Sequence, residues 1–290
     1  MKIIVTGGLG FIGKHFIASC SDHDVINIDA MTYAADMDAI GDAMFIPSNI
    51  CDLTKLPTHD ILINFAAESH VDRSINDCTP FVRSNVVGVQ NLLQLHPKRF
   101  IQISTDEVYG EINGDSVDET APLYPCNPYA ATKAAADHLI LAHDRAHDIN
   151  FNIIRPANNY GHRQYPEKLI PRSLRLIHEG LPAEIHGDGS YTRMWLNVKD
   201  TVNAIWRVIR YGENKAIYNI GGEEKSVLDI VKIISLKTGG DYVFIKNRSA
   251  QDYRYAINDT KIRALGWNPQ PFDITEIIEN YRNENSLLPG

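Results

Sequence analysis

The stretch Val5–Gly13, VTGGLGFIG, constrains the fold of this chain more than any other feature. It follows an apolar run and opens a helical pattern over Phe11–Cys20. Gly7, Gly10 and Gly13 fit the pattern G-x-x-G-x-x-G, in which the glycines permit a tight turn, close approach of a pyrophosphate and close packing of helix on strand. The N-terminus of that helix would offer N–H groups to phosphates. The motif therefore predicts a dinucleotide-binding βαβ unit.

Short apolar runs alternate with helical patterns through the first two-thirds of the chain. The predicted strands are KIIVTGG, DVINIDA, AMFIPS, DILINFAA, RFIQIST and FNIIRPA. Helical patterns over Phe11–Cys20, Thr79–Leu95 and Pro128–His147 lie between them. Continuous apolar strands separated by helices indicate a parallel, doubly wound sheet of the Rossmann type.

After Asn158 this alternation ends, which predicts a smaller C-terminal α/β lobe that binds substrate. We expect a helix that ends at Gly180, a strand edge and helix in MWLNVKDTVNAIWRVIRYG, a strand in KAIYNIGG, and a helix capped by Ser226. The predicted division assigns 1–157, with a return segment near 193–218, to the dinucleotide-binding domain. Residues 158–192 and 219–290 form the predicted lobe.

Charge and composition exclude several classes of function. The 290-residue chain is 44% hydrophobic, enough for a large core, and its net charge of −8 argues against bulk nucleic-acid binding. The four cysteines are scattered without C-x-x-C, and the histidines lack metal-ligand spacing, so we expect neither disulfides nor a metal. No apolar run approaches the roughly 20 residues that span a bilayer, and no signal peptide is recognised. These features predict a cytoplasmic protein without membrane contact.

An acid at the end of the second predicted strand identifies the dinucleotide. The strand ends in NIDA, which places Asp29 where a carboxylate accepts hydrogen bonds from a ribose diol. Because the same carboxylate would repel a 2′-phosphate, the sequence predicts NAD rather than NADP as cofactor.

Tyr129 and Lys133 lie four residues apart in NPYAATKAAADHLIL, so they share one helix face. A lysine beside a tyrosine favours the phenolate, which could take a proton from a substrate hydroxyl while hydride leaves its carbon. The pair alone is a weak signal, since solvated Tyr–Lys pairs are common. It gains weight from the glycine loop and from Ser104-Thr105 at the end of a predicted strand.

Together these motifs resemble the extended short-chain dehydrogenase/reductase superfamily, and within it the nucleotide-sugar 4,6-dehydratases. The resemblance covers nearly the whole chain. Its most specific stretches are DAMTYAAD, NFAAESHVDRSI, STDEVYG, PYAATKAAADHL, NNYGHRQYPEKLIP, GDGSYTRMWLNVKD and YNIGG. The adjacent acids Asp106 and Glu107 are typical of the dehydratases, whereas related epimerases and decarboxylases generally lack the pair.

The resemblance implies a redox-neutral dehydration. Tyr129, supported by Lys133 and Thr105, would deprotonate the sugar 4-hydroxyl while hydride passes from C4 to NAD. Glu107 would then remove the C5 proton, and Asp106 would protonate the departing 6-hydroxyl. Hydride returns to C6, which leaves a 4-keto-6-deoxy sugar. Neighbouring acids in a dry site can hold one protonated and one ionised carboxyl.

The resemblance also implies the binding residues. The expected cofactor contacts are Gly7, Gly10, Phe11, Ile12, Gly13, Asp29, Thr32, Asn49, Ile50, Ala66, Ala67, Tyr129 and Lys133. The expected contacts of a nucleoside-diphosphate sugar are Ser69, Ser74, Asn85, Thr105, Asn158, Asn159, Lys168, Leu169, Arg193, Asn219 and Arg248. A homodimer is expected through a four-helix bundle of Phe81–Leu95 and Tyr129–His147 from each subunit.

Departures from the family pattern keep alternatives open. Asn49 stands where an acid is usual, and the nucleotide-holding stretch reads RSAQDYRY, with Gln251 in place of a histidine. A dTDP-sugar is the first expectation and a UDP-sugar is the alternative. An epimerase or decarboxylase, and a non-catalytic NAD-binding protein, are the other two alternatives. The adjacent acids argue against an epimerase or decarboxylase, and the intact catalytic set argues against a non-catalytic protein.

Overall fold

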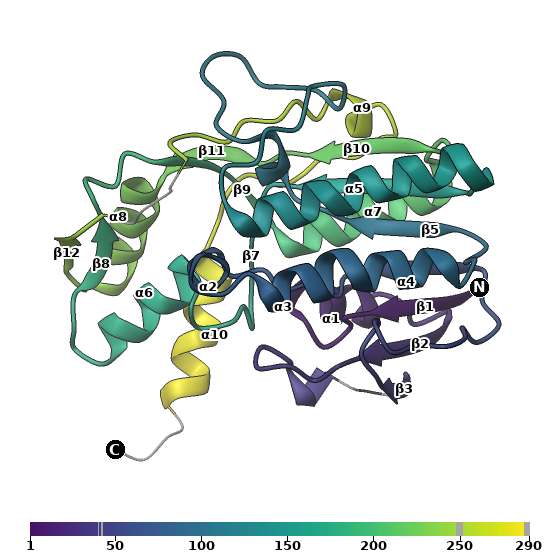
Figure 1. The fold of residues 1–290 in the computed structure, drawn as a ribbon. Helices are drawn as coiled ribbons and strands as arrows, with labels where there is room; N and C mark the ends of the chain where they lie inside the picture. Colours follow the sequence, from purple (N-terminus) through teal and green to yellow (C-terminus); the bar gives the residue numbers. More distant parts are fainter. Residues whose placement is uncertain (40, 42, 248–251, 287–290) are drawn as a thin grey trace.

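A parallel seven-stranded sheet forms the centre of the molecule (Figure 1). The computed structural model describes residues 1–39, 41, 43–247 and 252–286. The strand order is β10-β6-β5-β4-β1-β2-β3. The strands are β1 (Lys2–Thr6), β2 (Asp24–Asp29), β3 (Met44–Pro47), β4 (Ile61–Asn64), β5 (Phe100–Ile103), β6 (Phe151–Pro156) and β10 (Ala216–Ile220). The six strands predicted for the first part of the chain and the doubly wound fold class are confirmed.

Helices cover both faces of this sheet, as a doubly wound fold requires (Figure 1). On one face lie α4 (Gly88–Gln94) and α5 (Pro128–His147), and on the other lie α1 (Phe11–Ala18) and α7 (Val198–Tyr211). Shorter elements join them: η1 (Met37–Ala39), α2 (Val71–Asn76), α3 (Thr79–Phe81), η2 (Val82–Val87) and η3 (Asp106–Tyr109).

Two apolar cores lie on the two sheet faces, because successive side chains of a strand point to opposite sides. Ile3 and Val5 of β1 belong to the core that includes Phe16 of α1 and Ile205 of α7. Ile4, between them in sequence, belongs to the core formed with α4 and α5. This burial on both faces explains why the strands read as continuous apolar runs.

The predicted helix Thr79–Leu95 differs from a regular α-helix. It consists of α3, the π-helical turn η2 and α4. The buried Asn85 lies in the π turn, where its amide oxygen accepts from the Glu68 N–H at 2.9 Å and its amide nitrogen donates to the Glu68 carbonyl at 2.9 Å. The wide turn therefore fixes the loop after β4, a feature that no local sequence pattern indicated.

Among the described residues after β6, two small sheets and three helices lie outside the central sheet, and this part of the molecule is here called the lobe. Its strands are β7 (Asn158–Tyr160), β8 (Ala183–His186), β9 (Thr192–Asn197), β11 (Glu223–Ser226) and β12 (Tyr242–Ile245). Its helices are α6 (Leu169–His178), α8 (Val227–Thr238) and α10 (Thr275–Ser286), whereas α9 (Thr260–Arg263) packs against β10. Ser226 caps α8 as predicted, in a capping box with Asp229.

The return of the chain to the central sheet involves α7 and β10. The predicted return segment 193–218 also includes most of β9, but β9 pairs with β7 and β11 in the three-stranded sheet. Asn219, which the prediction assigned to the lobe, lies within β10 and pairs with Arg155 of β6. The two-domain division itself stays a prediction.

Across the part of the chain that the structure describes, none of the helices is both long and apolar enough to cross a membrane. The same residues contain no group of three or more His, Cys, Asp or Glu arranged to hold a metal ion. All four cysteines are free thiols.

Candidate active site

A cavity of about 1070 Å³ lies at the carboxyl ends of β1, β2, β4 and β5 and extends into the lobe. This position is where doubly wound sheets bind ligands, and the volume exceeds what one small ligand needs. All the predicted cofactor contacts and catalytic residues line it. The predicted substrate residues that line it are Ser69, Thr105, Asn158, Asn159, Lys168, Leu169 and Arg193.

The glycine loop packs against neighbouring backbone where a side chain would not fit. Gly7 has a φ of +74°, and a Cβ on it would lie 2.4 Å from the Ala66 nitrogen. A Cβ on Gly13 would lie 2.4 Å from the Gly7 carbonyl oxygen, so this glycine permits α1 to pack on the loop. Gly10, the residue before α1, lines the cavity, so a pyrophosphate fits at the N-terminus of this helix, as the sequence predicts.

Asp29 is held at the end of β2 by the glycine loop and its own turn. One carboxylate oxygen accepts the Leu9 N–H at 2.9 Å, and the other accepts the Met31 N–H at 2.7 Å. The side chain is buried, yet it lines the cavity. Each oxygen retains a lone pair, so the carboxylate can also accept hydrogen bonds from a ribose diol.

Tyr129 and Lys133 reach the cavity because α5 starts beside it. Asn127 caps the helix by accepting the Ala130 N–H at 2.8 Å, and Pro128 occupies the first turn. The Lys133 ammonium donates to the Ile103 carbonyl at 2.6 Å, and burial lowers its pKa to about 8. Burial also raises the pKa of the Tyr129 hydroxyl, so the free protein holds this tyrosine protonated.

A buried ion pair supports this part of α5. The Asp137 carboxylate accepts from the Arg155 guanidinium at 2.9 Å, and both side chains are almost fully buried. Arg155 also donates to the Tyr109 hydroxyl at 2.6 Å. Asp137, one turn after Lys133, opposes the effect of burial on the lysine pKa. The pair therefore fixes the helix and helps keep Lys133 charged.

The two adjacent acids occupy different environments. Asp106 is 2% exposed, and burial, followed by the charge of Glu107, raises the pKa of its carboxyl to about 8. Its Oδ2 is buried without a hydrogen-bond partner among the described residues, while Oδ1 accepts the Thr105 hydroxyl at 3.3 Å. This arrangement favours a protonated Asp106 at neutral pH.

Glu107 is better placed to carry a negative charge. Burial raises the pKa of its carboxyl too, but the Asn127 hydrogen bond and the charges of Arg193 and Lys168 oppose that shift. The Asn127 amide donates to Glu107 Oε2 at 3.1 Å. The site can therefore hold one protonated acid and one carboxylate side by side, which suits paired general acid and base chemistry.

Arg193 brings a guanidinium to the lobe side of the cavity. It donates to the Asp252 carbonyl at 2.8 Å and the Tyr253 carbonyl at 3.2 Å, and its guanidinium lies 4.3 Å from the Tyr255 ring centroid. Carbonyl groups hold it without neutralising its charge, so the charge remains available to an anion. Sequence analysis identified Arg193 but not Asp252 or Tyr255, which also line the cavity.

Three predicted substrate contacts do not line the cavity, because each is almost fully buried and hydrogen-bonded elsewhere. Ser74 donates to the Val71 carbonyl and accepts the Tyr129 N–H at 3.2 Å. Asn219 accepts the Tyr109 hydroxyl at 2.8 Å. Asn85 holds the loop after β4, as described above. In this structure all three support neighbouring elements. The predicted contact Arg248 lies outside the described residues.

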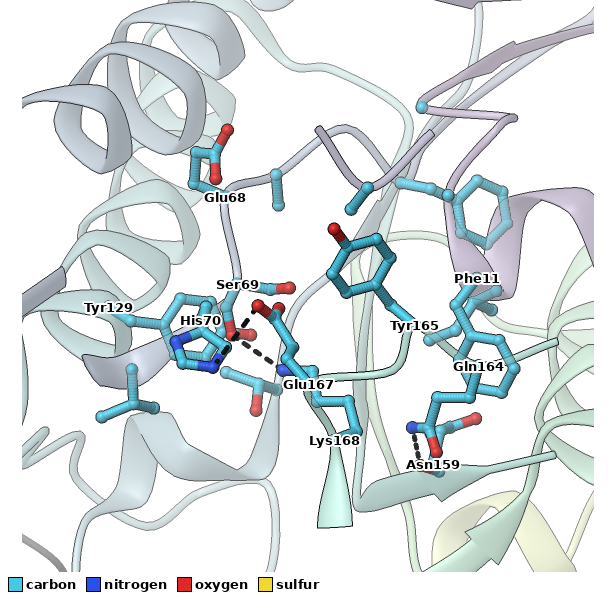
Figure 2. Close-up of a pocket in the computed structure, with 18 of the residues that line it drawn as sticks. Phe11, Glu68, Ser69, His70, Tyr129, Asn159, Gln164, Tyr165, Glu167 and Lys168 are labelled. Carbon is cyan, nitrogen blue, oxygen red and sulfur yellow. Dashed lines mark hydrogen bonds and ion pairs between the residues drawn. The ribbon is translucent and has the colours of Figure 1, made fainter. Parts of the chain in front are cut away.

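The loop between β7 and α6 contributes residues that sequence analysis largely missed (Figure 2). Glu167 lies 3.5 Å from the His70 ring nitrogen, and the Lys168 ammonium donates to the Ser69 carbonyl at 3.4 Å. The Tyr165 ring packs edge-on against Tyr33 at 5.4 Å between centroids. The motif NNYGHRQYPEKLIP was recognised, but only Lys168 and Leu169 were taken from this loop.

Comparisons with known proteins agree with this geometry. Residues 3–221 match the model of the NAD dependent epimerase/dehydratase family. The chain is 43% identical to the low-salt glycan biosynthesis protein Agl12 of Haloferax volcanii, over 93% of this chain and 94% of that protein. It is 39% identical to dTDP-glucose 4,6-dehydratase of Neisseria gonorrhoeae, over 92% and 91%. The solved DesIV dTDP-glucose 4,6-dehydratase of Streptomyces venezuelae, with NAD and TYD bound, superposes with a TM-score of 0.92 at 35% identity, covering 98% of both chains.

Proposed function

The chain belongs to the NAD-dependent epimerase/dehydratase family, and we propose that it converts dTDP-glucose to dTDP-4-keto-6-deoxyglucose. It is an NAD-dependent hydro-lyase of the nucleotide-sugar dehydratase type. The observation that carries the proposal is the Asp106–Glu107 pair, one acid favoured as protonated and the other as a carboxylate, in the cavity that also contains Tyr129 and Lys133.

Tyr129 starts the proposed reaction by taking the proton of the sugar 4-hydroxyl. The Lys133 ammonium, one helical turn away, favours the phenolate that this step requires. NAD, when bound, supplies the hydride acceptor and donor together with a positively charged ring that also favours the phenolate. The Thr105 side chain opposes the rise that burial causes in the pKa of Tyr129, so it is placed to orient the Tyr129 hydroxyl.

The two acids complete the dehydration. The 4-ketone acidifies the C5 proton, which the Glu107 carboxylate removes as general base. Asp106 protonates the departing 6-hydroxyl, which leaves as water, and Glu107 returns a proton to C5 when hydride returns to C6. Asp106 begins protonated and Glu107 begins ionised, so each acid starts in the state that its step needs.

Donors for the nucleoside diphosphate come from the lobe. Asn158, Lys168 and Arg193 come from the lobe and line the cavity, and two of them are cationic. Because the overall charge of the chain is −8, these local cations are what an anionic substrate would contact. The dTDP assignment is supported by the relatives named dTDP-glucose 4,6-dehydratase.

A paired incubation tests the proposal. The purified protein receives dTDP-glucose in one sample and UDP-glucose in the other, and products are identified by mass spectrometry and proton NMR. We expect loss of one water and a 4-keto-6-deoxy product from dTDP-glucose alone. The same product from UDP-glucose alone would reassign the nucleotide, and an unchanged mass in both samples would contradict the dehydratase proposal.

The pH profile provides a second test. Asp106 must be protonated and Lys133 charged, and both groups have a pKa of about 8. With NAD bound and the Tyr129 phenolate favoured by Lys133 and the nicotinamide ring, turnover is therefore expected to fall as the pH rises through that value. On the acid side, protonation of Glu107 removes the base, and because its pKa is raised, this loss begins above the usual glutamate range. A kcat/KM that keeps increasing well above pH 8 would contradict these roles.

We also propose a cytoplasmic homodimer that forms through η2, α4 and α5. Val82 and Val87 of η2 are 43% and 44% exposed, which leaves apolar side chains on this face for a second copy to cover. The four free thiols are consistent with a reducing compartment.

A further inference from the structure

Residues 163–168, here called the strap, link two elements of the lobe but bind loops of the central sheet. The strap runs from β7 towards α6. At its first end, the Arg163 guanidinium donates to Asp36 at 2.9 Å and to Asp38 at 3.1 Å. Lys14 of α1 donates to Asp36 at 2.8 Å and to the Arg163 carbonyl at 2.6 Å. Lys14 and Asp36 thus connect α1, the loop after β2 and the strap.

The backbone at this end is held in an unfavourable conformation. Arg163 has a φ of +60°, a region that residues other than glycine rarely adopt. In this conformation its carbonyl faces Lys14 while its guanidinium faces Asp36. The side chains of Lys14 and Asp36 are only 8% and 17% exposed, so solvent screens their ion pair weakly. The contacts with Lys14 and Asp36 therefore fix the strap at this point.

Glu167 anchors the other end of the strap (Figure 2). Its Oε1 accepts the Tyr33 hydroxyl at 3.2 Å, and its Oε2 lies 3.6 Å from Arg73 and 3.5 Å from His70. The Arg73 guanidinium lies 3.7 Å from the centroid of the Tyr33 ring. These partners belong to the loop after β2, to α2 and to the residue that caps α2, so both ends of the strap are attached to segments that follow strands of the central sheet.

Between its two anchors the strap borders the cofactor part of the cavity. Gln164, Tyr165 and Pro166 line the same cavity as Gly10 and Asp29. Figure 2 shows Tyr165 between the Ser69 segment and Phe11 of the glycine-loop helix. A dinucleotide with its pyrophosphate at the glycine loop and its ribose at Asp29 would therefore lie beneath the strap.

We propose that Lys14, Asp36, Arg163 and Glu167 are positioning residues that lock the strap over bound NAD and set the rate at which NAD leaves. This inference rests on the proposed function, in which hydride taken from C4 returns to C6 of the same sugar. Such a reaction needs no exchange of cofactor between turnovers, so slow release of NAD does not limit it.

The test measures release of NAD without any sugar present. Protein loaded with radiolabelled NAD is chased with excess unlabelled NAD, and the retained label is followed over time. We expect release to accelerate by about tenfold or more in Arg163→Gln, Asp36→Asn and Glu167→Gln, because each loses a charge-assisted contact. The matched control is Arg175→Gln. Arg175 lies on α6, outside the cavity, and the substitution removes its ion pair with Glu179, in which nitrogen and oxygen are 3.0 Å apart.

A double variant distinguishes the effect of losing the ion pair on NAD release from the effect of general damage to the fold. If Arg163 and Asp36 act as a pair, the variant with both substitutions should release NAD little faster than either single variant. Release rates equal to that of the unsubstituted protein in all three strap variants would overturn the proposal. So would acceleration in the Arg175→Gln control of the same size.

Hydrogen exchange on the unsubstituted protein keeps the test decisive if a variant does not fold. The backbone amides of residues 163–165, 167 and 168 should become more protected when NAD is bound, whereas exchange unaffected by NAD would overturn the proposal. Neither experiment uses a sugar nucleotide. A failed paired incubation with normal strap results would reject only the dehydratase proposal, and the reverse pattern would reject only the strap.

Discussion

Tyr129→Phe is expected to lower the single-turnover rate of ketone formation by about 10²–10⁴-fold, the usual range for loss of a positioned acid–base group. The substitution removes only the hydroxyl that takes the proton from the sugar. The aromatic ring remains, and with it the edge contact to Phe81 at 6.4 Å between centroids. The measurement is a rapid-quench time course of 4-keto product with enzyme in excess over substrate.

Bound NAD and thermal stability must be measured on the same Tyr129→Phe preparation, because this residue is also a predicted cofactor contact. Tyr281→Phe is the matched control, since Tyr281 lies on α10 and outside the cavity. A Tyr129→Phe rate within about twofold of the unsubstituted rate, with normal NAD content, would assign proton removal to another group.

The parts of the site that sequence analysis predicted depend on local signals. In the glycine loop, Gly7 adopts a positive φ that favours glycine, and the helix α1 begins a few residues later. Asn127 and Pro128 mark the start of α5, which then fixes Tyr129 and Lys133 on one face. A short stretch of sequence is sufficient to place such residues, because the geometry is set by one turn or one helix.

Polar residues beside a recognised motif were less predictable. Arg193 and Asn219 both occur in family-like stretches, but Arg193 lines the cavity whereas Asn219 is fully buried against Tyr109. Whether such a side chain faces the cavity or the core depends on whether the packed core offers it a hydrogen-bond partner. A sequence pattern cannot state this, because the partner Tyr109 is 110 residues away.

The strap was missed for a related reason. Arg163 and Asp36 are 127 residues apart, and Glu167 and Tyr33 are 134 apart. As isolated charges in a polar loop they read as solvated surface residues. They come together only where the lobe packs over the central sheet. The left-handed backbone at Arg163 could not be predicted either, because the position holds neither glycine nor asparagine.

Glu107→Gln is expected to reduce overall turnover by about 10²–10⁴-fold while leaving oxidation at C4 nearly unchanged. The amide is close to the carboxylate in size and can still accept the Asn127 hydrogen bond of 3.1 Å, but it cannot take the C5 proton. The absorbance of reduced nicotinamide should therefore rise and persist after substrate is added. In deuterated water, recovered substrate should carry no deuterium at C5, because the step that would exchange that proton is blocked.

Asp106→Asn is the matched comparison, because it changes the neighbouring acid in the same way. Glu107 remains in this variant, so C5 should still exchange with solvent deuterium while loss of water is slow. The opposite pattern, with exchange in Glu107→Gln and none in Asp106→Asn, would reverse the two assignments. That result would also mean that the charges of Arg193 and Lys168, which oppose the rise in the pKa of Glu107, do not decide which acid is ionised. Asp106, despite the burial that raises its pKa to about 8, would then be the base.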